Sequence, residues 1–84
     1  MAKRQTFRQD LIATASREYV RLRSRERVSD FLDDFVQVGS FPAMNAVRLS
    51  ARLTWDAADD ALDAMSWPHL VAAVERAVDK ERRW

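Results

Sequence analysis

Four aspartates are the residues whose types and spacing best suit them to bind a partner. They lie at i, i+3, i+4 and i+7, as Asp56, Asp59, Asp60 and Asp63. Projected at the helical period, they share one arc of about 100°. Like charges at these spacings destabilise an isolated helix by roughly a few tenths of a kcal/mol per pair, so a mixed face would cost less. The pattern indicates a docking surface for a basic partner, or else a solvated face that keeps the protein soluble.

Five arginines form a second charged set. They are Arg17, Arg21, Arg23, Arg25 and Arg27. The first two are spaced i, i+4 on one side of a helix, and the other three follow in or near a turn. Arginines beside a helix end can hold phosphates, which makes the segment a candidate for sequence-independent nucleic-acid binding. However, Glu18 and Glu26 are interleaved and no aromatic series is present for base stacking. Pairing within the chain, with the acidic helices, is an equally good account.

Charge is strongly segregated along this 84-residue chain, although its net charge is only +1. Residues 3–27 carry eight Lys and Arg against three acids, whereas residues 28–66 carry two against seven. Such asymmetry in a short chain predicts a surface for charged partners or for another copy of the chain, as in a homodimer.

Residue types that support catalysis or metal binding are scarce. The chain has no Cys and a single His, His69, so it lacks a cysteine nucleophile and the residues for a thiolate or histidine-rich metal site. The adjacent acids Asp33-Asp34 and Asp59-Asp60 point about 100° apart on a helix and do not converge on one ion. The sequence contains no P-loop, G-x-G-x-x-G, G-x-S-x-G or H-E-x-x-H pattern. We therefore expect no enzymatic activity, no cofactor and no metal.

Hydrophobic runs are short. None approaches the 18 or so residues that span a bilayer. The basic segment Met1 to Gln5 is not followed by the apolar core of a secretory signal. These observations predict a cytoplasmic protein that has no membrane partner.

The scarcity of Gly and Pro and the absence of β-type alternation predict an all-α fold. We expect one helical domain over 1–84, a compact bundle of four to five short helices preceded by a flexible tail at 1–5. The expected helices are 6–24, 29–38, 42–53, 55–65 and 67–82. The first two are alternatively one continuous helix. The third and fourth have the short link of a helix-turn-helix, but an acidic recognition helix would be repelled by phosphates.

Individual residues predict where the helices begin and end. N-caps are expected at Thr6, Ser29, Thr54 and Ser66. Gln9 completes a capping box with the first of these. Pro42 and Pro68 suit the first turns of their helices. Gly39, the only glycine, is expected to end the second helix in a left-handed conformation.

The apolar faces of these helices predict one hydrophobic core. It comprises Phe7, Leu11, Leu22, Phe31, Leu32, Phe35, Met44, Val47, Leu49, Leu62, Leu70 and Val74. The helix at 42–53 is apolar on nearly all sides, a pattern typical of a central, buried helix.

Together these features predict a non-catalytic accessory or inhibitor protein of the phage or mobile-element type. Its acidic face, formed by the aspartates of 56–63, would occlude a basic surface of a partner protein, including one whose normal ligand is nucleic acid. Trp84 would either anchor such an interface or dock back on the domain. The alternative is a small DNA- or RNA-binding regulator that uses the arginines from Arg17 to Arg27.

Overall fold

The computed structural model describes residues 6–83. Within this range the chain forms five helices and no strand, which confirms the all-α prediction. They are α1 (Phe7–Arg21), α2 (Val28–Phe35), α3 (Pro42–Ser50), α4 (Trp55–Asp63) and α5 (Trp67–Arg82). The tail predicted at 1–5 and the anchoring role predicted for Trp84 lie outside the described residues.

Several helices begin at the residues that the sequence predicts. The Thr6 hydroxyl accepts from the Gln9 backbone N–H, and the Gln9 side chain accepts from the Thr6 N–H, so the capping box is complete. Thr54 caps α4 by accepting from the Ala57 N–H at 3.1 Å. Pro42 and Pro68 both lie in first turns, where a missing N–H costs little. Ser66 precedes α5 as predicted, although its side chain makes no capping hydrogen bond.

The first helix ends a turn earlier than predicted, and the continuous alternative is wrong. Arg23 adopts a left-handed conformation (φ 52°), and Ser24 donates its N–H to the Tyr19 carbonyl while Arg23 donates to Val20. This pair of bonds is a Schellman motif, which closes a helix C-terminus. Arg52 closes α3 in the same way (φ 59°). Because glycine usually occupies this position, an arginine there gives no sequence signal for the end of either helix.

The second helix is displaced and shorter than predicted. It begins after Arg27, which is its N-cap, so the prediction of Ser29 as the cap is wrong. It ends at Phe35 with Val36 as the C-cap. Gly39 does adopt a left-handed conformation (φ 80°), but in the turn beyond the helix rather than at its end.

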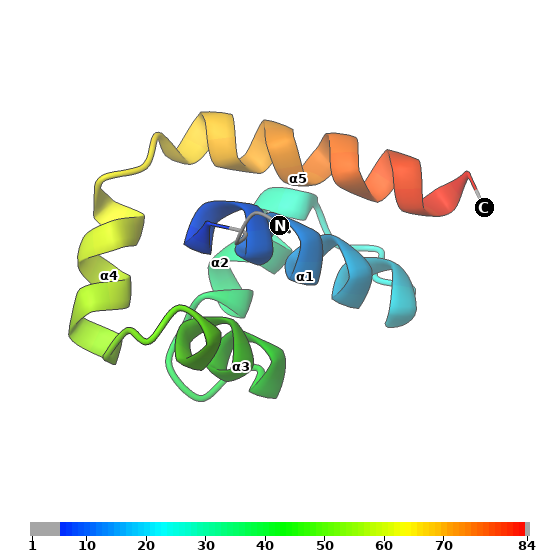
Figure 1. The fold of residues 1–84 in the computed structure, drawn as a ribbon. Helices are drawn as coiled ribbons and strands as arrows, with labels where there is room; N and C mark the ends of the chain where they lie inside the picture. The colour runs from blue at the N-terminus through cyan, green and yellow to red at the C-terminus, as the bar shows by residue number, and fades with distance from the viewer. Residues whose placement is uncertain (1–5, 84) are drawn as a thin grey trace, which may run out of the picture.

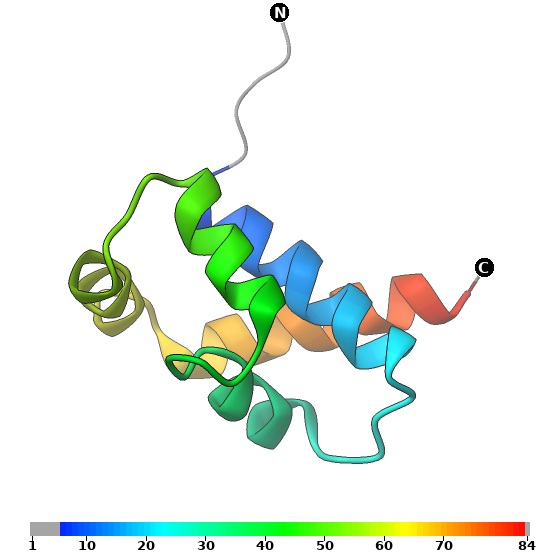
Figure 2. The same cartoon turned by 90° about the horizontal axis from the view of Figure 1, so that it is seen from below.

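The first helix, α1, lies at the centre of the arrangement (Figures 1 and 2). It packs against α5 along one side, and against α3 and α2 on others. In both views α4 stands away from this group, at the opposite side of the molecule from the connection between α1 and α2. The prediction that the helix at 42–53 is central is therefore wrong, because α3 buries only Met44 and Val47.

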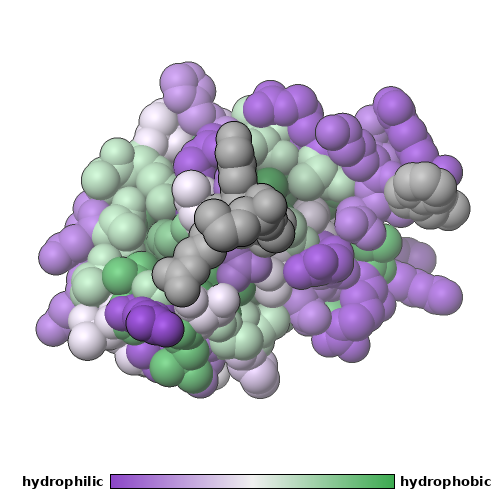
Figure 3. All heavy atoms as spheres, in the orientation of Figure 1, coloured by the Kyte–Doolittle hydropathy of each residue, from purple (hydrophilic) through white to green (hydrophobic). Residues whose placement is uncertain are grey.

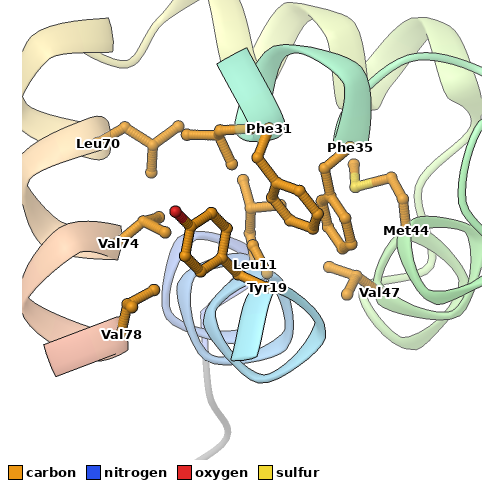
Figure 4. Packing of buried hydrophobic residues seen from close by; sticks show 11 residues of the cluster. Leu11, Tyr19, Phe31, Phe35, Met44, Val47, Leu70, Val74 and Val78 are labelled. Carbon is orange, nitrogen blue, oxygen red and sulfur yellow. The ribbon is translucent and has the colours of Figure 1, made fainter. Parts of the chain in front are cut away.

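One core lies between α1, α2, α3 and α5 (Figure 4). Its aromatic part is a cluster in which Phe31 meets Tyr19 edge to face, with ring centroids 5.1 Å apart, and stacks on Phe35 at 6.0 Å. Phe41 contacts both phenylalanines. Eight predicted core residues are buried: Leu11, Phe31, Leu32, Phe35, Met44, Val47, Leu70 and Val74. Phe7 and Leu62 are partly buried against this core.

The core prediction is wrong for two residues. Leu22 is 46% exposed and Leu49 is 56% exposed. Leu22 is the C-cap of α1 and keeps right-handed helical backbone, but it borders an open hollow at the end of the core. Leu49 lies on the face of α3 that points away from α1. Among the residues that the predicted core lacked, Tyr19 and Val78 are buried.

Candidate functional site

The acidic helix face exists as predicted. Asp56, Asp59, Asp60 and Asp63 are all exposed on α4. None of them forms an ion pair within residues 6–83, where the recorded pairs are Arg21–Glu18 and Arg83–Asp79. The four carboxylates therefore give α4 an acidic, solvent-facing side.

The opposite side of α4 attaches the helix to the rest of the molecule through few residues. Ala58 is its only fully buried residue. Trp55 and Leu62 are partly buried against the core. Since packing of an apolar face supplies most of a short helix's stability, α4 has a comparatively weak hold on the fold.

Arg48 supplies a polar attachment for α4 that sequence reasoning missed. Its guanidinium donates to the Leu53 carbonyl at 2.7 Å and to the Asn45 side-chain oxygen at 2.6 Å. The same group lies over the Trp55 ring, 4.8 Å from its centroid. Arg48 thus connects the end of α3 to the start of α4. The sequence shows that Arg48 and Trp55 are seven residues apart. Whether their side chains make contact depends on the turn between α3 and α4.

Replacing Arg48 with alanine should loosen α4 specifically. Loss of the two hydrogen bonds and the cation–π contact is expected to cost about 1–2 kcal/mol. Amide hydrogen exchange in α4 should accelerate about tenfold, while amides of α1 and α5 keep their protection. Arg76→Ala is the control, because Arg76 is exposed on α5 and forms none of these contacts. Equal acceleration in all helices, or none in α4, would contradict this role for Arg48.

A groove lies beside the acidic face. We call it the acidic groove and define it by its lining residues: Val36, Gln37, Val38, Asp59, Leu62, Asp63, Met65 and Trp67. Its volume is about 810 Å³. Val38 is 62% exposed and Trp67 is 36% exposed, so both present apolar surface to the groove. The site therefore combines an apolar surface with two carboxylates.

The groove divides the four aspartates into two pairs. Asp59 and Asp63 line it, whereas Asp56 and Asp60 lie on the same helix outside it. Sequence reasoning found the carboxylates but missed the groove, because its other wall comes from the segment between α2 and α3. Val38 was the one groove residue that the sequence could have drawn attention to. It is an apolar residue predicted at the end of the second helix, whereas in the structure it follows the end of α2.

The five predicted nucleic-acid-binding arginines are all exposed and lie on two consecutive segments of the chain. Arg17 and Arg21 lie exposed on α1, and the others lie in the following connection. Arg21 donates two hydrogen bonds to Glu18, at 3.1 and 2.8 Å, which lower the pKa of the Glu18 carboxyl. This pair largely compensates the charge of Arg21.

The connection between α1 and α2, residues 22–27, is held in place by Tyr19. We call it the arginine loop, since Arg23, Arg25 and Arg27 are exposed along it. The Tyr19 hydroxyl donates to the Glu26 carbonyl, and the Arg82 guanidinium lies over the Tyr19 ring at 5.4 Å. The loop also borders a shallow hollow with Leu22, Phe31 and Phe41 in its lining.

The acidic groove and the arginine loop lie on opposite sides of the molecule. In Figure 1, α4 is at the left and the loop at the right, and Figure 2 shows the same separation. On the face shown in Figure 3, hydrophilic residues gather toward the loop side and hydrophobic ones spread toward α4. The described residues include no ion pair between the two charged segments, so their pairing within one chain is not observed.

Other kinds of site are not seen in residues 6–83. No group of three or more His, Cys, Asp or Glu is arranged to hold a metal ion there. None of its helices has the length and apolarity that a membrane crossing needs. The chain matches no protein-family model, no curated protein and no solved structure.

Proposed function

We propose that this protein is a non-catalytic binding protein whose acidic groove docks on a basic surface of a partner protein. The observation that carries the proposal is a groove lined both by the carboxylates Asp59 and Asp63 and by the partly exposed apolar side chains Val38 and Trp67. An apolar centre with charged residues at its edge is the usual anatomy of a protein-binding patch.

The two parts of the groove have different roles in this proposal. Burial of Trp67 and Val38 under a partner supplies affinity, because large apolar and aromatic side chains contribute most at interfaces. The carboxylates select a basic partner and speed its approach. A partner segment that fits carries an apolar side chain flanked by Lys or Arg.

The biological role that follows is occlusion. A partner surface rich in Lys and Arg often binds nucleic acid, and a protein that covers it would block that use. The protein would thus act in the cytoplasm as an accessory or inhibitor protein of the phage or mobile-element type, needing neither a cofactor nor a catalytic residue.

The second candidate is a regulator that binds DNA or RNA through the arginine loop. It is favoured by one observation, the exposure of Arg23, Arg25 and Arg27 without an acidic partner in the described part of the chain. The absence of exposed aromatic side chains among these arginines weighs against base stacking.

The two candidates separate in a pair of titrations. The first probe is a synthetic helical peptide with leucines at i, i+3 and i+7 and arginines on its other faces. The second is duplex and single-stranded DNA, at about 50 mM and about 200 mM salt. We expect saturable peptide binding and no DNA binding at the higher salt. Tight DNA binding that weakens steeply with salt, together with no peptide binding, would reverse the assignment.

A further inference from the structure

The arginine loop carries the chemistry that the acidic groove would accept. Leu22 stands 46% exposed at its start, and Arg23, Arg25 and Arg27 follow it. Glu26 is the only acid within residues 22–27. An exposed apolar side chain flanked by arginines is the complement of an apolar groove flanked by aspartates.

The arginine loop is held in a defined shape by its contacts with α1. The Schellman motif at the end of α1 and the hydrogen bond from Tyr19 to Glu26 order the arginine loop. In the groove, Trp67 is the first residue of α5, and Asp59 and Asp63 lie on α4. Pre-ordered surfaces lose less conformational entropy on association than flexible ones.

We infer that copies of this protein associate head to tail, with the arginine loop of one copy in the acidic groove of the next. Because the two surfaces lie on opposite sides of the molecule, one chain cannot satisfy its own groove (Figures 1 and 2). The contact is heterologous, so it continues from copy to copy as an open chain or closes into a ring of more than two copies. The inference uses the groove of the proposed function, and a basic partner would compete with the second copy for it.

Sedimentation velocity over about 10 µM to about 1 mM protein tests this association. At low salt the weight-average mass should rise above the 9.7 kDa of one chain and pass the value for two chains. At about 0.5 M salt it should return toward one chain, because exposed charge pairs are screened.

Two neutralised variants identify the surfaces. The groove variant carries Asp59→Asn and Asp63→Asn and has lost the charge of the acidic groove. The loop variant carries Leu22→Ser, Arg25→Gln and Arg27→Gln and has lost the apolar and basic side chains of the arginine loop. Each variant alone should remain a single chain at concentrations where the unmodified protein associates. Mixed in equal amounts, they should form a one-to-one dimer and nothing larger, since the mixture holds one intact surface of each kind per pair. Circular dichroism should show unchanged helicity for both.

Three results would overturn the inference. One is a single chain at every concentration at low salt. Another is a mass that stops at two chains, which indicates a closed symmetric dimer. The third is a mixture of the variants that stays monomeric. None of these bears on the peptide titration, which is performed at protein concentrations below those at which association begins, so the two proposals fail separately.

Discussion

Replacing Phe35 with alanine is expected to lower the free energy of unfolding by about 3–5 kcal/mol, the usual cost of removing a buried phenylalanine. Phe35 has no exposed surface, and its ring contacts both Phe31 and Phe41. The cavity would open where α2 meets the other helices of the core. A chain of 84 residues has a total stability of about 4–13 kcal/mol. The variant should therefore lose between about a quarter and all of that stability, as measured by urea denaturation followed by circular dichroism.

Leu49→Ala provides the comparison for this prediction. It also truncates a large apolar side chain within a helix, but Leu49 is 56% exposed on α3. Its cost should stay within about 0.5 kcal/mol, as for most surface substitutions. Similar losses at the two positions would contradict the packing described for α2 and α3.

Reversing the two charges that line the groove, by Asp59→Lys with Asp63→Lys, should lower affinity for the basic helical peptide about 30-fold. Each reversal turns an attraction of about 0.5 kcal/mol, for charges about 8 Å apart in water, into a repulsion of the same size, a change of about 1 kcal/mol. Two such changes, about 2 kcal/mol, convert to that loss of affinity. Isothermal titration calorimetry measures it directly, with helicity checked by circular dichroism.

The matched control is Asp56→Lys with Asp60→Lys. This variant makes the same change in net charge on the same helix, but at carboxylates that do not line the groove. It should lower the affinity for the peptide by only about two- to threefold, because the lost attraction is long-range and screened by salt. Equal losses in the two variants would mean that α4 attracts the peptide by its overall charge, without a defined groove.

Much of the fold follows from local signals in the sequence. Thr6 and Thr54 begin helices because their hydroxyls accept backbone hydrogen bonds, a property that depends only on near neighbours. The apolar periodicity of α1, α2 and α5 likewise places Leu11, Phe35 and Val74 in the core.

The errors fall where tertiary packing overrides a local pattern. Arginines at 23 and 52 close their helices in a conformation that glycine would mark clearly in a sequence. Leu49 was assigned to the core because α3 is apolar on most sides, yet α1 covers only one of them.

The candidate site was predictable only in part. The spacing of the aspartates on α4 identifies the acidic face, since helix geometry alone sets it. The groove forms where residues 36–38 and Trp67 lie beside α4. That arrangement depends on how segments far apart in the sequence pack together. The attachment through Arg48 depends in the same way on the turn between α3 and α4.

The central claim is that the acidic groove is where a basic partner binds. Chemical-shift mapping on the isotope-labelled protein, titrated with the basic helical peptide at a protein concentration below that at which copies associate, tests it most directly. The account predicts that backbone amides of residues 36–38 and 59–67 shift as the peptide saturates, while those of the arginine loop do not. Shifts that concentrate at residues 22–27, or that spread over the surface without saturation, would contradict it.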